Sequence, residues 1–571
     1  MADLHDKEMG VNEKDTTHHI ENFETAEEQN AYAVKGDDSD GHIPMTPRRF
    51  IAMVSLLMSY VGANLPLFFI SGSLTFLQAS IKNPQTQGWS TTSYGVALAA
   101  VTPFSGYLQD LVGRRYVVLL GSLLICIGLA VIGSSHRFLQ LIFGCVITGI
   151  GAGITELTST AGLAEVVSVK HRGYTLALLY AFILPFAPYV LYAQLLGEHA
   201  TWRWSIWLAL IYNAVALCGL IFSYFPRSHL RAEGVRRRDL AKEVDFFGGF
   251  LSTAGIVLFL VGLQSGGTIW PWKNGKVIAP MVIGLVLIFA FIIWEWKGAK
   301  YPMVPSAIFQ GQRIVGACMV TAFVCGMNLY AVLNFMPLMF STVYDPDPMH
   351  VGLKSLGFGL GQTIGATVMN VLMSVFKNHQ RENLLSSCII MTIFIASLAA
   401  VTPDNAKTVI ALTALAGWGV GGIIAPIATI ALSATPDAFL ATVISLINAL
   451  KFLGGSIGYS IYYAIFSGKI KTKLPATVAA YAIKAGLPLT SVEGFVGIFL
   501  TDPTKLATTP IPGLTPAVIA AASKGLRWAY ADSVKFVWYT TIPFGVICIV
   551  AVLVMGNTRK YQTNRVAAAL E

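Results

Sequence analysis

Charged residues are scarce in this chain of 571 residues, since aspartate, glutamate, lysine and arginine make up only 12% of it. A soluble domain carries roughly 25% charged residues, and even a large soluble protein needs a charged shell. Hydrophobic residues make up 54% of the chain, and they occur in blocks of about 20, the length that crosses a bilayer. The shortage of charge therefore excludes a soluble protein and predicts an all-α polytopic membrane protein.

Cysteine is scarce as well, and its pattern excludes several kinds of site. The seven cysteines all lie inside apolar blocks, and none has the spacing of a metal site. They are interpreted as small buried hydrophobic residues. No serine-elbow or histidine-box pattern is present either. We therefore expect no metal, no cofactor and no catalytic residues, which means that the protein is not an enzyme.

Signatures of nucleotide binding are also missing. The glycine-rich runs at 357–361 and 417–422 lie inside apolar blocks, with no Gly-Lys-Ser/Thr after them. Close packing and bending of helices explain them better. The formal net charge of +9 comes from short Lys/Arg clusters between the apolar blocks, where such clusters orient a membrane protein. We expect neither a nucleotide nor a nucleic acid as a partner.

The apolar blocks predict fourteen membrane-spanning helices. Because this number is even, both termini lie on the same side, and twenty Lys/Arg residues flank the spans on the predicted cytosolic side against seven on the other. This bias places both termini in the cytosol. The predicted spans lie near 50–72, 90–109, 116–134, 138–162, 173–196, 204–225, 245–264, 277–296, 314–342, 352–376, 384–402, 408–433, 440–467 and 535–556.

Polar segments divide these spans into groups of six, two and six. A polar, acidic N-terminal segment without periodicity predicts a disordered cytosolic tail. Alanine-rich stretches at 476–485 and 517–530 predict helix within a long external loop that folds over the exit. The predicted divisions are a tail at 1–45, a six-helix bundle at 46–225, a basic cytosolic linker at 226–243, an inserted helix pair at 244–297, a second six-helix bundle at 298–556 with its external loop at 468–534, and a cytosolic tail at 557–571.

The sharpest motif lies between the second and third spans. It reads Gly106-x-x-x-Asp110-x-x-Gly113-Arg114-Arg115. Gly106 allows close helix contact and Gly113 allows a tight turn, while Asp110 can pair with an arginine or with a helix N-terminus. A plain positively charged loop with an incidental acid is the alternative. We interpret the motif as a conformational latch that biases the protein towards the outward-facing state.

With this loop the chain resembles the major facilitator superfamily. Other stretches resemble its fourteen-helix drug:proton antiporters, and the subgroup that the whole chain resembles most is the fungal trichothecene efflux pump group. The resemblance implies a secondary active transporter that exports fungal toxins, other secondary metabolites or drugs across the plasma membrane by proton antiport, with a vacuolar or vesicle membrane as the alternative. These stretches are Thr201–Trp204, Asp245–Gly248, Trp294-Glu295, Pro302–Arg313 and the cytosolic charge pair Glu165 and Arg172.

Two departures from the family pattern weaken the proton coupling that the resemblance implies. Cys145 stands where relatives carry an arginine on the fourth span, and the segment Leu184–Tyr189 lacks the usual glycines. Glu156 is the carboxylate placed well inside the bilayer, where a charge is costly, so it is the candidate for proton coupling. Gly149 and Gly153 share its helical face and let it approach another helix. The alternative is a neutral glutamic acid that hydrogen-bonds two helices.

Polar residues within other spans are candidates for a central substrate cavity, which transporters of this kind place near the middle of the membrane. For each of them, hydrogen bonding between helices is the alternative, and for Lys451 the alternative is extension of its side chain to the cytosolic face. The candidates are Gln194, Asn328, Tyr330, Asn334, Gln362, Asn448 and Lys451.

The expected partners are a small-molecule substrate and the lipid bilayer, with the protein acting as a monomer and the proton gradient as its energy source. A rival hypothesis keeps the fold but reverses the direction of transport, as in a siderophore-iron importer. A non-transporting membrane sensor and a membrane enzyme are further rivals. Neither is favoured, because the sequence contains no signalling domain and no catalytic arrangement.

Overall fold

A computed structural model describes residues 46–81, 86–166, 172–226, 245–267, 269–299, 302–304, 306–309, 313–435, 439–501, 506, 511–556 and 558. Within these ranges the regular structure is helical, apart from an isolated β-bridge between Gly266 and Trp270. The predicted terminal tails at 1–45 and 557–571 and the basic linker at 226–243 lie almost wholly outside the described residues.

A first helix bundle forms from residues 47–223. Helices α4 and α5 both pack on α6, and α2 packs on α9. The fifth predicted span is split into α7 and α8, because Pro185 and Pro188 lack the N–H donors that the helix needs and their rings crowd the preceding turn; a 3₁₀ turn, Leu184–Phe186, lies between the two helices. The bounds are α2 Pro47–Gly72, α3 Leu74–Ile81, α4 Thr86–Val112, α5 Arg114–Gly133, α6 Phe138–Val166, α7 Arg172–Ala181, α8 Tyr189–His199 and α9 Arg203–Ser223.

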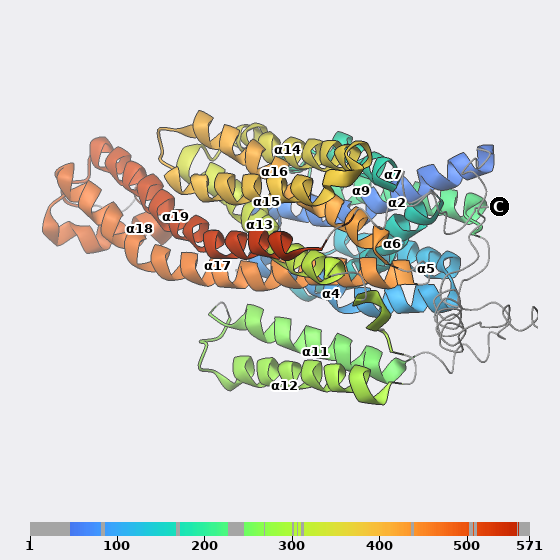
Figure 1. Cartoon of the computed structure of the whole chain (residues 1–571). Helices are drawn as coiled ribbons and strands as arrows, with labels where there is room; N and C mark the ends of the chain where they lie inside the picture. Colours follow the sequence, from blue (N-terminus) through green and yellow to red (C-terminus); the bar gives the residue numbers. More distant parts are fainter. Residues whose placement is uncertain are drawn as a thin grey trace, which may run out of the picture.

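A separate helix pair follows, formed by α11 (Phe246–Ser265) and α12 (Gly275–Ile293). The side chain of Asp245 caps α11 by accepting a hydrogen bond from the Gly248 N–H at 2.8 Å, and it also accepts one from Trp294 Nε1 at 2.8 Å. One carboxylate thus ties the start of α11 to the residue that follows α12. The pair lies along one side of the molecule, where α11 packs on α4 (Figure 1).

A second helix bundle contains the rest of the chain. Its closest contacts join α14 with α16, α13 with α17, and α17 with α19. Its helices are α13 Ile314–Met339, α14 Pro348–Val375, α15 Gln380–Ser397, α16 Ala406–Ser433, α17 Leu440–Lys484, α18 Val492–Thr501 and α19 Pro516–Val554. Short 3₁₀ or π segments lie before or between them at Ser306–Phe309, Phe340–Tyr344, Lys377–His379, Leu398–Ala400 and Leu489–Ser491, and another, Trp294–Gly298, directly follows α12.

The two glycine-rich runs hold α14 against α16. A methyl group at Gly361 would overlap the backbone oxygen of Ala414, and one at Gly421 would overlap the backbone oxygen of Gln362. Only glycine allows the two backbones to lie this close. The prediction that these runs serve helix packing is therefore confirmed.

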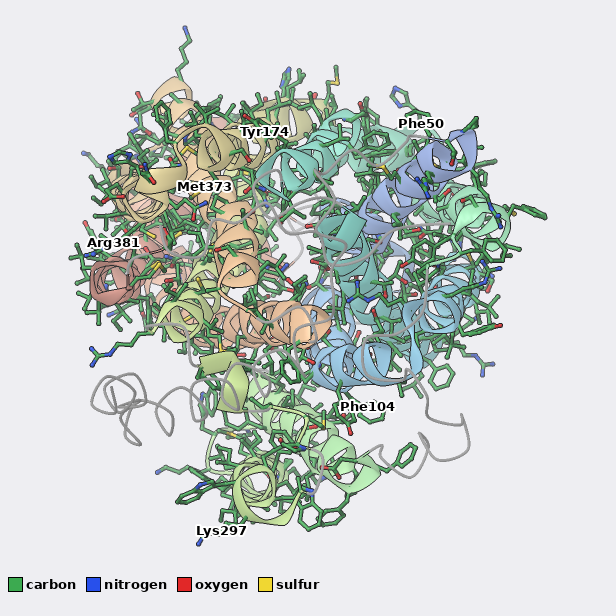
Figure 2. All side chains as sticks on the ribbon, turned by 45° about the vertical axis from the view of Figure 1, so that its right-hand side comes forward. Phe50, Phe104, Tyr174, Lys297, Met373 and Arg381 are labelled. Atoms are coloured by element: carbon green, nitrogen blue, oxygen red, sulfur yellow. The ribbon has the colours of Figure 1, made fainter. Side chains whose placement is uncertain are left out.

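The two bundles lie side by side, with the α11–α12 pair to one side of both (Figure 2). Helix α4 of the first bundle packs on α17 of the second, and α14 of the second packs on both α7 and α8 of the first. Helices α6 and α17 also touch each other, so the interface between the two bundles includes both.

Thirteen helical segments in the described part of the chain are long and apolar enough to cross a membrane. Helix α4, which matches the second predicted span, has 27 residues but is not among the thirteen. An all-α polytopic membrane protein is therefore confirmed. The number fourteen and the cytosolic placement of both termini stay predictions.

The alanine-rich stretches 476–485 and 517–530 of the predicted external loop are helical almost throughout, as expected, but they continue the neighbouring spans, which are therefore longer than predicted. Helix α17 continues without a break to Lys484, α19 begins at Pro516, and the two project together beyond the rest of the bundle (Figure 1). Alanine-rich sequence favours continued helix, and a small core of its own, with Val478, Phe495 and Val518 among its residues, packs α17, α18 and α19 together. The segment forms a helical extension, because tertiary packing stabilises helices outside the bundle as it does inside.

Candidate functional site

A buried ion pair joins the two bundles. Lys451 of α17 donates a hydrogen bond to the Oε1 atom of Glu156 on α6, with 2.9 Å between the Lys451 Nζ and Glu156 Oε1 atoms. The two residues are 7% and 2% exposed. The Lys451 ammonium group also lies 4.4 Å from the centre of the Phe452 ring. Because both charges are buried, the stability of each depends on the other.

Glycines place both members of the pair. Gly149 and Gly153 lie against α4, where a methyl group would meet the backbone oxygen of Tyr94 or the hydroxyl group of Thr102. The predicted close approach of this face of α6 is therefore confirmed. On the other side, a methyl group at Gly326 of α13 would overlap the backbone oxygen of Lys451. The backbones of α6 and α17 are thus fixed by neighbours within their own bundles.

The second carboxylate oxygen of Glu156 sets this residue apart. The Oε2 atom is buried and has no hydrogen-bond partner among the described residues. A buried carboxylate oxygen without a partner is costly when ionised.

Two cavities meet at the ion pair. The larger has a volume of about 50 Å³ and the smaller about 20 Å³, and both are lined by Tyr60, Tyr180, Ile424 and Lys451. Glu156 lines only the smaller one. The Tyr60 and Tyr180 rings pack edge to face with 5.7 Å between their centres. Lys451 and these two tyrosines are therefore part of the wall that the two cavities share, with Glu156 on the side of the smaller one.

Four of the predicted cavity residues line these cavities. Tyr330 and Gln362 line the larger one, Asn448 lines the smaller one, and Lys451 lines both. Extension of Lys451 to a surface, the alternative interpretation of this residue, is excluded in this conformation because Lys451 is buried against Glu156.

The other three predicted cavity residues line neither of the two cavities, so their placement is corrected. Gln194 donates to the backbone oxygen of Gly72 at 2.7 Å, and Asn334 donates to the backbone oxygen of Tyr330 at 2.9 Å. Asn328 accepts a hydrogen bond from Tyr462 inside the second bundle at 3.4 Å. The amides of Gln194 and Asn328 thus bond to another helix, the role considered as the alternative, whereas the bond of Asn334 lies within α13.

Sequence reasoning missed the aromatic part of the site. Tyr60, Tyr180 and Tyr189 line the larger cavity together with Phe68 and Phe452. Tyrosines within apolar spans are the sequence signal that was available, because a buried tyrosine needs a partner for its hydroxyl group. That signal does not show which tyrosines face the same space, since they come from different helices.

The loop motif between α4 and α5 is described only in part. Gly113 has a φ angle of 110°, so the prediction of a turn that requires glycine is confirmed. Arg115 donates to the backbone oxygens of Ile221 and Tyr224 at the end of α9, and its guanidinium group lies 3.5 Å from the centre of the Phe225 ring. These are contacts within the first bundle, at a helix C-terminus that favours a cation.

The other residues of the predicted latch and of the predicted charge pair are described only in part. Arg114 is buried, as is Gly106. The side chains of Asp110, Glu165 and Arg172 lie outside the described part of the structure. The latch and the cytosolic charge pair therefore stay predictions. Among the described residues, no group of three His, Cys, Asp or Glu side chains is placed to hold a metal ion.

Comparison with known proteins adds the family. The fungal trichothecene efflux pump family matches residues 26–571. The chain belongs to this family. The chain is 27% identical over 532 residues to the MFS-type transporter prx5 of Penicillium rubens, and this match covers 91% of this chain and 93% of that protein. It is 24% identical over 541 residues to the trichothecene efflux pump of Fusarium sporotrichioides, covering 91% and 88% of the two chains.

Solved structures confirm the fold of this family member. The major facilitator superfamily proton:xylose symporter XylE has a TM-score of 0.52 and 14% sequence identity, and the match covers 91% of this chain and 98% of that one. At this identity the likeness concerns the fold alone. The predicted major facilitator fold is therefore confirmed, and so is the resemblance to the trichothecene efflux pump group.

Proposed function

We propose that this protein exports small organic molecules, namely fungal toxins, other secondary metabolites or drugs, across the plasma membrane in exchange for protons. Membership of an efflux pump family supports export over siderophore-iron import. The observation that carries the proton exchange is the buried ion pair between Glu156 and Lys451, which joins the two bundles where the two cavities meet.

The ion pair provides a simple coupling mechanism. When Glu156 is ionised, it holds Lys451 and so holds the two bundles together. When Glu156 takes up a proton, the pair loses its attraction and the bundles are free to rock about the central cavity, which is how such transporters alternate their access. Proton release on the cytosolic side restores the pair. No nucleotide is needed, because the proton gradient supplies the energy, and one chain contains both halves of the pair.

The test uses inside-out plasma membrane vesicles and a tritiated trichothecene. With an acidic interior, vesicles with the unaltered protein are expected to accumulate the compound. Vesicles with Glu156→Gln should lose the accumulation that depends on the gradient, because glutamine cannot release a proton. Glu198→Gln is the matched control, because Glu198 is exposed near the end of α8 and lines neither cavity.

Two outcomes would contradict the proposal. Equal accumulation by Glu156→Gln and the unaltered protein would remove Glu156 from the coupling. Accumulation only in right-side-out vesicles would indicate import, in which case the siderophore-iron rival would have to be tested instead. Amounts of protein in the membrane are measured for every variant so that a loss of transport is not a loss of protein.

A further inference from the structure

Two tyrosine hydroxyl groups at the larger cavity have no hydrogen-bond partner among the described residues. They belong to Tyr189 on α8 of the first bundle and Tyr330 on α13 of the second. Both residues line the cavity, and each is only 4% exposed. Buried hydroxyl groups are normally hydrogen-bonded, and one that is not needs an explanation.

Other polar groups of the same cavity are already engaged. Asn64 donates to the backbone oxygen of Tyr60 at 3.0 Å, Thr363 donates to the backbone oxygen of Gly359 at 2.9 Å, and Lys451 is held by Glu156. Among the described residues that line the cavity, the buried side-chain atoms without a hydrogen-bond partner are therefore the hydroxyl groups of Tyr189 and Tyr330, one from each bundle.

Both tyrosine rings are held in place by their surroundings. The Tyr189 ring stacks on Phe68 of α2, with 4.8 Å between the ring centres and 22° between the planes. The Tyr330 ring lies in a slot between two glycines. A methyl group at Gly455 would be 2.6 Å from the edge of the ring, and one at Gly95 would be 3.1 Å from the hydroxyl oxygen. Fixed rings present their hydroxyl groups without an entropic cost on binding.

We propose that the hydroxyl groups of Tyr189 and Tyr330 bind the transported molecule, one from each bundle, and that this molecule is uncharged and carries two acceptor oxygens. The inference rests on the proposed export of small organic molecules. The remaining wall is apolar, with Leu67, Ile183 and Leu333 among its residues, which suits a mostly apolar ligand. Because one ligand contacts both bundles, an occupied cavity draws the bundles together.

The experiment measures binding of a tritiated trichothecene to the purified full chain in lipid nanodiscs, without a proton gradient. Tyr189→Phe and Tyr330→Phe should each weaken binding by roughly three- to tenfold, the effect of one hydrogen bond. The double variant should show the product of the two effects. Tyr192→Phe is the matched control, because Tyr192 lies on the same helix, points its hydroxyl to the backbone oxygen of Pro185 and lines neither cavity.

An analogue of the probe that lacks one acceptor oxygen sharpens the test. The unaltered protein should bind it more weakly, and one of the two tyrosine variants should then have no further effect. Unchanged affinity for the probe in both single variants would overturn this inference while leaving the proposed function intact. Absence of binding by the unaltered protein would overturn the inference and also count against the proposed substrate class. Equal midpoint temperatures of thermal unfolding for all variants confirm that they are folded.

Discussion

Helices α6 and α12 are both apolar enough to cross a membrane, yet they are used in opposite ways. In the most apolar 18-residue window of each, 56% of the α6 residues are buried within the protein but only 11% of the α12 residues. Helix α12 exposes large side chains such as Phe289 and Ile293. Helix α6 has glycines against α4 and a carboxylate paired across the bundles. Within a bilayer, small and polar residues therefore mark the protein interior better than hydrophobicity does.

The largest effect is expected from separating the charges of the ion pair. Lys451→Met leaves Glu156 buried without its partner, which should lower the free energy of unfolding by about 3–5 kcal/mol. The double variant Glu156→Gln/Lys451→Met should regain most of this loss, because no buried charge is left. Thermal unfolding in detergent measures both. A double variant as unstable as the single one would show that the pair itself, and not the unpaired charge, determines stability.

The next effect tests the close contact of α14 and α16. Gly421→Ala places a methyl group against the backbone oxygen of Gln362, so the helices must separate, and we expect a loss of about 1–3 kcal/mol. Gly316→Ala on α13 is the matched control, because a methyl group there meets no other atom within 4 Å. Thermal unfolding of the two variants is compared. Equal midpoints would mean that the helix contact relaxes at no cost.

A smaller effect is expected from removing the side chain of Asp245, which ties the start of α11 to the end of α12. Asp245→Ala removes the cap of α11 and the hydrogen bond to Trp294, and should cost about 1–2 kcal/mol. Trp294→Phe removes only the second interaction and should cost less. Protease sensitivity of the chain around α11 and α12 reports the change. Greater damage from Trp294→Phe than from Asp245→Ala would contradict the role given to the cap.

The smallest effect is expected on the exposed face of α12. Phe289→Leu should change the free energy of unfolding by no more than about 0.5 kcal/mol, because Phe289 is 63% exposed and packs on little protein. Phe335→Leu on α13 is the contrasting variant, since Phe335 is 2% exposed and its loss of volume should be felt. Similar effects of both variants on thermal unfolding would mean that α12 faces another protein surface.

Local patterns were sufficient for most of the architecture and for one part of the site. The apolar blocks predicted the spans because a bilayer sets the length of a helix. The glycine faces predicted close helix contacts, and Glu156 was evident as an acid inside an apolar span. The alanine-rich stretches of the external loop were expected to be helix-prone, but not that they continue α17 and α19 without a break. Such an extension is stable only when its neighbours supply a core, which here comes from α18 and α19.

The sequence by itself determined that this is a polytopic membrane protein, where its helices pack closely and that Glu156 is exceptional. Only the tertiary structure decided that Glu156 pairs with Lys451, which lies 295 residues away. It alone showed that Tyr189 and Tyr330 line one cavity from different bundles. Helix periodicity records which residues share a face of one helix, but it contains no information about which faces of distant helices meet. That choice is made by the packing of the two bundles.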